Sequence, residues 1–202
     1  MRLLFVLLIF TCVGKNKAQQ HVFYLHGRII EIQGADAVET TNGYGAYKYN
    51  TIIDSLKANN FIVHSEVRSG NTDISAYAQK IQLQINELLQ KGVKAKDICV
   101  IGASKGASIA LKVAELVNNS QVKYVVLAAC CNNDAKNLSG QFLSIYEASD
   151  NCGTCTNHII PASTDSRLSE IELNTGLRHG FFYLPRNEWL VPTVKWAKNT
   201  NY

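Results

Sequence analysis

Residues 101–110 read IGASKGASIA and place a serine, Ser104, between two glycines. The segment from Gly102 to Gly106 matches the pattern GxSxG, in which a serine occupies a sharp turn between a strand and a helix. Flanking side chains must be small there, because the backbone is crowded. Backbone N–H groups at the start of the helix would lie where negative charge develops, as a nucleophile requires. The alternative is an ordinary strand-to-helix turn that needs small residues only for packing.

A serine hydroxyl needs a general base, and a histidine late in the chain is available. His179 lies in the segment LRHGFF, in a predicted loop before the final helix. Asp150, in the segment EASD, begins the loop after an earlier strand and is the candidate acid. Glu147 is the rival acid, but it is predicted to lie inside that strand. His158 is the rival base, but it follows the acid strand too closely. The order serine, acid, histidine is the one expected with this motif.

Acyl transfer also requires two N–H donors for the oxyanion. The backbone N–H of Lys105, directly after the serine, is predicted to be one donor. The second is assigned to the backbone N–H of Arg28 in the segment YLHGRII, where Gly27 lets the backbone approach the substrate closely.

Residues 29–45 are predicted to form a long loop beside this site, and long loops are often functional. Charged residues also follow the second predicted strand. The predicted substrate-binding residues are Glu31, Tyr44, Glu66 and Arg68. For the charged members, the alternative is a set of mutual salt bridges without any substrate contact.

Strands and helices alternate along the chain. Strands are predicted at 22–25, 61–67, 97–102, 122–129, 142–148 and 169–174, and helices at 46–60, 73–92, 105–117 and 187–199. This alternation predicts an α/β fold, with a mostly parallel central sheet of about six strands and helices on both faces. In such sheets the functional residues lie at the carboxyl ends of the strands, and the polar candidates are all predicted to lie there.

The first residues differ from the rest. Residues 1–18 combine a basic residue, a short apolar run and a small residue, which predicts a signal peptide cleaved after Ala18. A lipoprotein anchored at Cys12 is the alternative. Cleavage leaves residues 19–202 as one predicted domain, secreted or periplasmic, with no membrane contact. It also lowers the formal charge from +4 to +1, and no basic stripe remains that would bind nucleic acid.

The number and placement of the cysteines fit a secreted protein. Cys99 lies in an apolar strand and is predicted to be a buried free thiol. The other cysteines of the predicted mature chain form two pairs, Cys130 with Cys131 and Cys152 with Cys155. We predict a disulfide from one pair to the other, because their strands are expected to be neighbours; a local bridge within the second pair is the alternative. A zinc site would need further ligands that this CxxC segment lacks.

The segments LHGR, GASKGA, EASD and LRHG together resemble the α/β-hydrolase superfamily in its small form without a cap domain, over most of residues 21–198. The resemblance implies a serine hydrolase with the triad Ser104, Asp150 and His179. It implies no cofactor and a small-molecule substrate, an ester before an amide or thioester. Only about a dozen residues join the fourth and fifth predicted strands, so no cap, and hence no large lipid pocket, is expected.

The mixture of charged and aromatic residues predicted around the site favours short-acyl or small polar esters. The alternative function is a non-catalytic binding protein on the same scaffold that uses residues 29–45 as its contact surface. The sequence predicts neither an oligomeric state nor a natural substrate.

Overall fold

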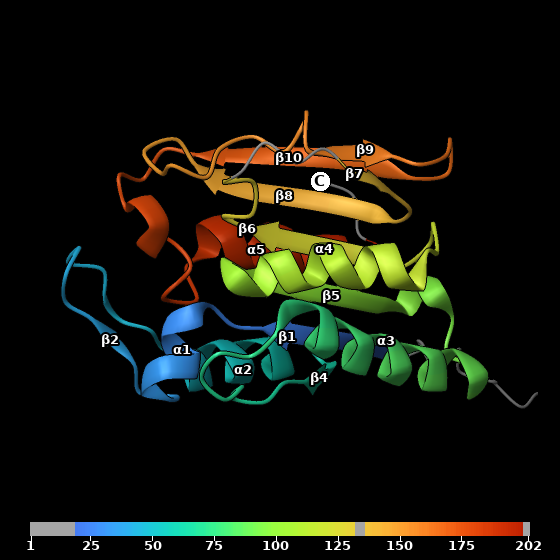
Figure 1. Ribbon diagram of the computed structural model, residues 1–202, viewed down its shortest axis with the longest axis horizontal. Helices are drawn as coiled ribbons and strands as arrows, with labels where there is room; N and C mark the ends of the chain where they lie inside the picture. Colours follow the sequence, from blue (N-terminus) through green and yellow to red (C-terminus); the bar gives the residue numbers. More distant parts are fainter. Residues whose placement is uncertain (1–18, 132–135, 200–202) are drawn as a thin grey trace, which may run out of the picture.

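The computed structural model describes residues 19–131 and 136–199, and a six-stranded sheet lies at its centre. The strands are β1 Gln20–Leu25, β4 Phe61–His64, β5 Ile98–Ala103, β6 Lys123–Leu127, β8 Gln141–Glu147 and β10 Arg167–Leu173. Their order is β10-β8-β6-β5-β1-β4, and every neighbouring pair is parallel (Figure 1). The predicted sheet is therefore confirmed. The predicted signal peptide lies outside the described residues.

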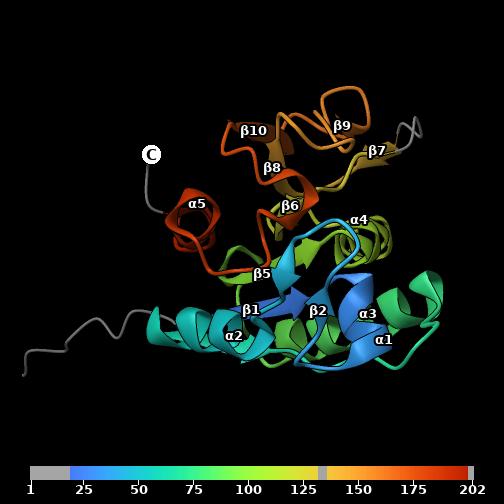
Figure 2. The same cartoon turned by 90° about the vertical axis from the view of Figure 1, so that its left-hand side faces the viewer.

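Helices cover both faces of the sheet (Figure 2). Helices α2 Tyr49–Ala58 and α5 Asn187–Ala197 lie on one face, and α3 Ile74–Gln90 and α4 Lys105–Val117 on the other. Successive side chains of a strand point to opposite faces, so each strand supplies both layers of the core. In β1, Val22 belongs to the buried cluster that includes Leu56 of α2. Its neighbour Phe23 belongs to the cluster that includes Ile81 of α3.

Helix α3 shows how local sequence sets these boundaries. The Asp73 carboxylate caps it by accepting the Ala76 N–H at 2.8 Å. Ile81 and Ile85 are four residues apart, so both lie on one face of the helix and are buried in the core. Gly92 follows the helix with φ of 86°, a left-handed conformation that glycine adopts without strain.

Residues 29–45 are not the continuous loop that the sequence predicts. They contain most of the short helix α1 Arg28–Gln33 and a small hairpin of β2 Val38–Glu39 and β3 Gly45–Ala46. The Glu39 carboxylate closes the hairpin by accepting backbone N–H groups from Thr41, Asn42 and Tyr44. A six-residue helix and two-residue strands are too short to show a hydrophobic period, which is why the pattern did not reveal them.

The connection between β6 and β8 is short, as expected. Its described residues hold one strand, β7 Lys136–Leu138, which pairs with β9 Ile159–Pro161, and they contain no cap domain. Two 3-10 turns, η1 Ala95–Asp97 and η2 Arg178–Gly180, complete the elements. Within residues 19–131 and 136–199, no helix has the length and apolar character needed to cross a membrane.

Candidate active site

Ser104 occupies a strained turn between β5 and α4. Its φ of 53° and ψ of −117° lie outside the regions that L-residues normally adopt. The glycines on either side explain how the turn fits. A Cβ atom on Gly106 would lie 1.9 Å from the backbone oxygen of Leu25, and one on Gly102 would lie 2.3 Å from the backbone oxygen of Gly106. Only glycine lets α4 start this close to β1.

The turn η2 brings His179 to the serine. The His179 Nε2 atom lies 2.9 Å from the Ser104 Oγ, and its Nδ1 lies 2.7 Å from an Asp150 carboxylate oxygen. The imidazole thus lies between a hydroxyl and a carboxylate. The His179 side chain is 25% exposed, whereas that of Asp150 is only 6% exposed. The structure therefore brings together the three residues that the sequence singled out for catalysis.

Glu147, the rival acid, has a different position. It ends β8, is fully buried, and faces the turn that follows β10 rather than His179. Its carboxylate accepts the Thr175 hydroxyl at 2.7 Å and the backbone N–H groups of Thr175 and Gly176. Burial raises the pKa of Glu147, but these hydrogen bonds outweigh that effect and lower the pKa overall. Glu147 thus anchors the segment that leads into His179.

Two disulfides hold the loop that carries Asp150. Cys130 is bonded to Cys155, and Cys131 is bonded to Cys152. The prediction of bridges between the two pairs is therefore confirmed, and the local bridge is excluded. Cys99 is a buried free thiol, as predicted. The sulfur of Cys152 lies 3.9 Å from His179 Nδ1, so the second disulfide packs against the histidine itself.

The two predicted oxyanion donors each begin a helix. Lys105 is the first residue of α4, directly after Ser104, and Arg28 is the first residue of α1. The first N–H groups of a helix have no intrahelical partner and are free for other acceptors. Gly27 precedes Arg28 and lies against the serine, since a Cβ atom there would be 3.7 Å from Ser104 Cβ. Its φ of −72° is open to other residues, so closeness to Ser104 is what distinguishes this glycine.

A buried ion network connects these two helix starts. The Glu31 carboxylate, on α1, accepts the Arg68 Nε–H at 2.8 Å and the Lys105 Nζ at 2.6 Å. The Glu31 and Arg68 side chains are each only 1% exposed. They were predicted to contact substrate, but their charges are turned inward and engage each other. The predicted alternative, a mutual salt bridge, describes this pair.

His26 joins the same network. Its Nε2 accepts the Arg68 backbone N–H at 2.9 Å, which leaves Nδ1 protonated to donate to the Gly27 carbonyl at 2.9 Å. The Arg68 guanidinium also donates to the His26 carbonyl. Burial, followed by the nearby Arg68 charge, lowers the pKa of His26 to about 4. The imidazole is therefore neutral near neutral pH and holds the turn before Arg28.

The other two predicted substrate contacts lie farther out. Tyr44, on the β2–β3 hairpin, lies close to the residues on either side of His179: its ring lies 5.3 Å from the Arg178 guanidinium, and a Cβ atom on Gly180 would be 2.9 Å from Tyr44 Cβ. Glu66 is about half exposed and pairs with Lys80 at 2.5 Å. Tyr44 alone of the four predicted substrate contacts thus borders the segment that carries the histidine.

Comparison with known proteins identifies the fold. No family model matches the chain, and neither does any curated protein sequence. SOBER1 from Arabidopsis thaliana is similar in structure, with a TM-score of 0.59 and 12% identity over 90% of this chain and 99% of that one. A putative YdeN-like hydrolase from Pectobacterium atrosepticum gives a TM-score of 0.54 at 12% identity, over 90% and 92% of the two chains.

A third similar structure is XC6422 from Xanthomonas campestris, described as an α/β serine hydrolase without a lid. Its TM-score is 0.51 at 13% identity, over 92% of this chain and 83% of that one. The described residues of this chain have the α/β-hydrolase fold and contain no cap domain. Identities this low establish the fold alone, and the chemistry of this α/β-hydrolase domain has to be argued from its own residues.

One group of potential metal ligands includes residues of the candidate active site. Asp150, Cys152 and His179 offer ligand atoms within 4.8 Å of one another. The Cys152 sulfur is bonded to Cys131, so it is not available as the thiolate that a metal would need.

Sequence reasoning missed two supports of the candidate active site. The contact between Cys152 and His179 joins residues whose loops meet only in the folded chain. The Lys105 side chain was overlooked because attention fell on its backbone N–H, yet its ammonium binds Glu31 from another helix. The adjacency of Lys105 to the serine was the only signal in the sequence.

Proposed function

We propose that this protein is a secreted serine hydrolase that acts on short-acyl or small polar esters. The observation that carries the proposal is the continuous hydrogen-bonded series from Ser104 through His179 to Asp150, with the serine on a strained turn. A serine that served only for packing would not need such a partner. The complete series also weighs against a non-catalytic binding protein on this fold.

The proposed reaction proceeds through an acyl-enzyme. Ser104 Oγ attacks the ester carbonyl carbon while its proton passes to His179 Nε2, and the carbonyl oxygen becomes an oxyanion. The N–H groups of Arg28 and Lys105 stabilise that charge. The histidine then donates the proton to the departing alkoxide. A water molecule repeats the sequence on the acyl-enzyme, releasing the acid and restoring the serine. Asp150 keeps His179 in the required tautomer throughout.

The surroundings of the serine support small substrates. The described connection between β6 and β8 contains no cap, and the His179 side chain is partly open to solvent. A long acyl chain gains about 0.8 kcal/mol per methylene only when it enters a dry groove. The charged Arg178 and the half-buried Tyr44 that border the histidine do not form such a groove.

Secretion rests on two features. Residues 1–18 have the composition of a signal peptide, and the two disulfides fit an oxidising compartment. Both cross-links lie in the loop that positions Asp150, so export and catalytic geometry are connected in this proposal.

Turnover of a short-chain ester by purified mature protein tests the activity. We expect Ser104→Ala to lower kcat/KM by at least about 1000-fold without loss of fold, because it removes the nucleophile. Ser108→Ala, on the same helix α4, is the matched control and should stay close to wild type. Near-normal turnover by Ser104→Ala would reject the proposal, and a wild type inactive on a broad ester panel would favour the binding-protein alternative.

A further inference from the structure

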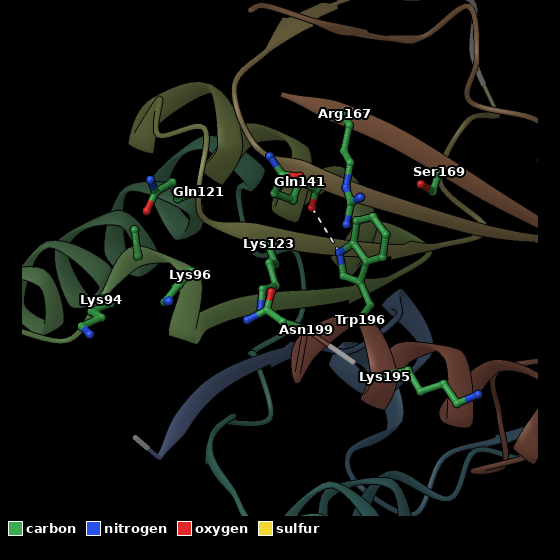
Figure 3. Close-up of a pocket in the computed structure, with 11 residues that line it drawn as sticks. Lys94, Lys96, Gln121, Lys123, Gln141, Arg167, Ser169, Lys195, Trp196 and Asn199 are labelled. Atoms are coloured by element: carbon green, nitrogen blue, oxygen red, sulfur yellow. Dashed lines mark hydrogen bonds between the residues drawn. The ribbon is translucent and has the colours of Figure 1, made fainter. Parts of the chain in front are cut away.

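A concave site lies at the amino-terminal ends of the strands, opposite the ends that lead to Ser104 and Asp150. A cavity of about 830 Å³ is lined by residues that begin three strands: Lys123 of β6, Gln141 of β8 and Arg167 of β10. Residues just before β5 and at the end of α5 complete its wall (Figure 3). Because the strands are parallel and five to seven residues long, this end of the sheet lies about 20 Å from the serine.

The lining is strongly basic. Its cationic residues are Lys94, Lys96, Lys123, Arg167 and Lys195, and none of the described residues that line it is acidic. Figure 3 shows Lys123 near the centre, Lys94 and Lys96 together at one side, and Arg167 reaching over the Trp196 ring. The Arg167 guanidinium lies 4.6 Å from that ring, which fixes one cation at the wall. Lys195 points away from the centre in the same view.

Lys123 shows that this charge is built into the fold. It is 3% exposed, and its ammonium donates to the Ala197 carbonyl at the end of α5. Burial is the main factor that lowers the pKa of Lys123, and the Lys96 and Arg167 charges lower it further, against Asp97 and Cys99, which raise it. The cations therefore repel one another, and an anion among them would relieve that repulsion.

We propose that this cavity binds a small polyanion, a sugar-sized molecule that carries several phosphate or sulfate groups. Its volume falls in the range of small-molecule sites and exceeds what one inorganic anion fills. Cations at several separate positions fit several anionic groups on one ligand, and the fork of Arg167 suits a tetrahedral oxyanion. The Gln121 and Asn199 amides on the lining supply neutral donors for hydroxyl groups. This proposal does not depend on the hydrolase activity.

Calorimetric titration of purified mature protein tests it. The probes are inositol hexakisphosphate and sucrose octasulfate, with uncharged inositol and sucrose as blanks. We expect saturable binding of at least one polyanion, weakened by added salt, and none of the blanks. The ratio of the two affinities distinguishes a phosphate ligand from a sulfate ligand.

Matched charge reversals locate the binding. We expect the exposed pair Lys94→Glu/Lys96→Glu to lose at least about tenfold in affinity. The control, Lys48→Glu/Arg186→Glu, makes the same change in net charge at exposed residues that directly precede α2 and α5, and should lose no more than about twofold in affinity. Equal losses in both double variants would show diffuse attraction and overturn the proposal, as would the absence of saturable binding by either polyanion.

Discussion

Two loops meet at Ser104, and the chain secures them by different means. The acid loop, residues 148–155, is cross-linked by two disulfides to Cys130 and Cys131, which follow β6. The segment that carries the proposed oxyanion donor Arg28, residues 26–31, is called the oxyanion turn; it contains no cysteine and is held by the ion pairs of Glu31 with Arg68 and Lys105. One loop thus depends on the redox state of its surroundings, and the other on charge and pH.

The difference follows from what each loop has to position. Asp150 needs only to face one imidazole, and the bridge from Cys131 to Cys152 places the loop directly beside that ring. In the proposed mechanism, Arg28 of the oxyanion turn and Lys105 of α4 must align their backbone N–H groups. Glu31 binds Arg68 with one carboxylate oxygen and Lys105 with the other, which connects α1 to the start of α4. Fixed donors are the feature that stabilises an oxyanion most effectively.

Removing the charge at the centre of the ion network should have the largest effect on stability. We expect Glu31→Gln to lower the free energy of unfolding by about 3–5 kcal/mol, because Arg68 would remain buried without its counter-charge. Chemical denaturation measures this. Glu66→Gln removes the partner of Lys80 from an exposed pair and should cost less than about 1 kcal/mol. Similar losses in both variants would mean that the buried network does not secure this turn.

Breaking the disulfides one at a time separates cross-linking from contact with the histidine. The bridges are nested, with sequence separations of 25 and 21, so the bridge that remains in each double serine variant still closes most of the loop. Each variant should therefore lose about 2 kcal/mol of stability, the chain-entropy value for the loop of about six residues that the second bridge closes. Ester turnover should fall further in Cys131→Ser/Cys152→Ser than in Cys130→Ser/Cys155→Ser, because only Cys152 contacts His179. If turnover falls equally, the sulfur contact has no role of its own.

Acid should destabilise the oxyanion turn by protonating His26. The folded pKa of His26, about 4, lies below its ordinary value of 6.5, so the unfolded chain binds the proton more readily. Stability should therefore fall as pH drops through this window, by about 2 kcal/mol from about pH 7 to about pH 5. Thermal denaturation across that range measures it. His26→Asn should flatten the dependence, and an unchanged slope would assign it to other groups.

The sequence predicted those parts of the molecule that show a hydrophobic period or a known sequence motif. The six strands of the sheet and the pairing of cysteines across neighbouring strands follow from local pattern and from the order of parallel strands. The GxSxG motif, Asp150 and His179 also come together in space.

The sequence left other long-range contacts undecided. Nothing local indicates that Glu31 faces Arg68, 37 residues away, rather than a substrate. The basic cavity escaped notice for the same reason, because its cations are spread over several segments of the chain and the predicted mature chain has little net charge. Such clusters form only when parallel strands bring their starts to one edge.

Covalent labelling tests the central claim most directly. A fluorophosphonate reagent reacts with a serine that is activated as a nucleophile, and peptide mapping of the labelled mature protein locates the adduct. We predict one adduct, on the peptide that contains Ser104, with labelling abolished in Ser104→Ala and strongly slowed in His179→Ala. Labelling that persists in Ser104→Ala, or folded wild-type protein that does not react, would contradict the assignment of Ser104 as a catalytic nucleophile.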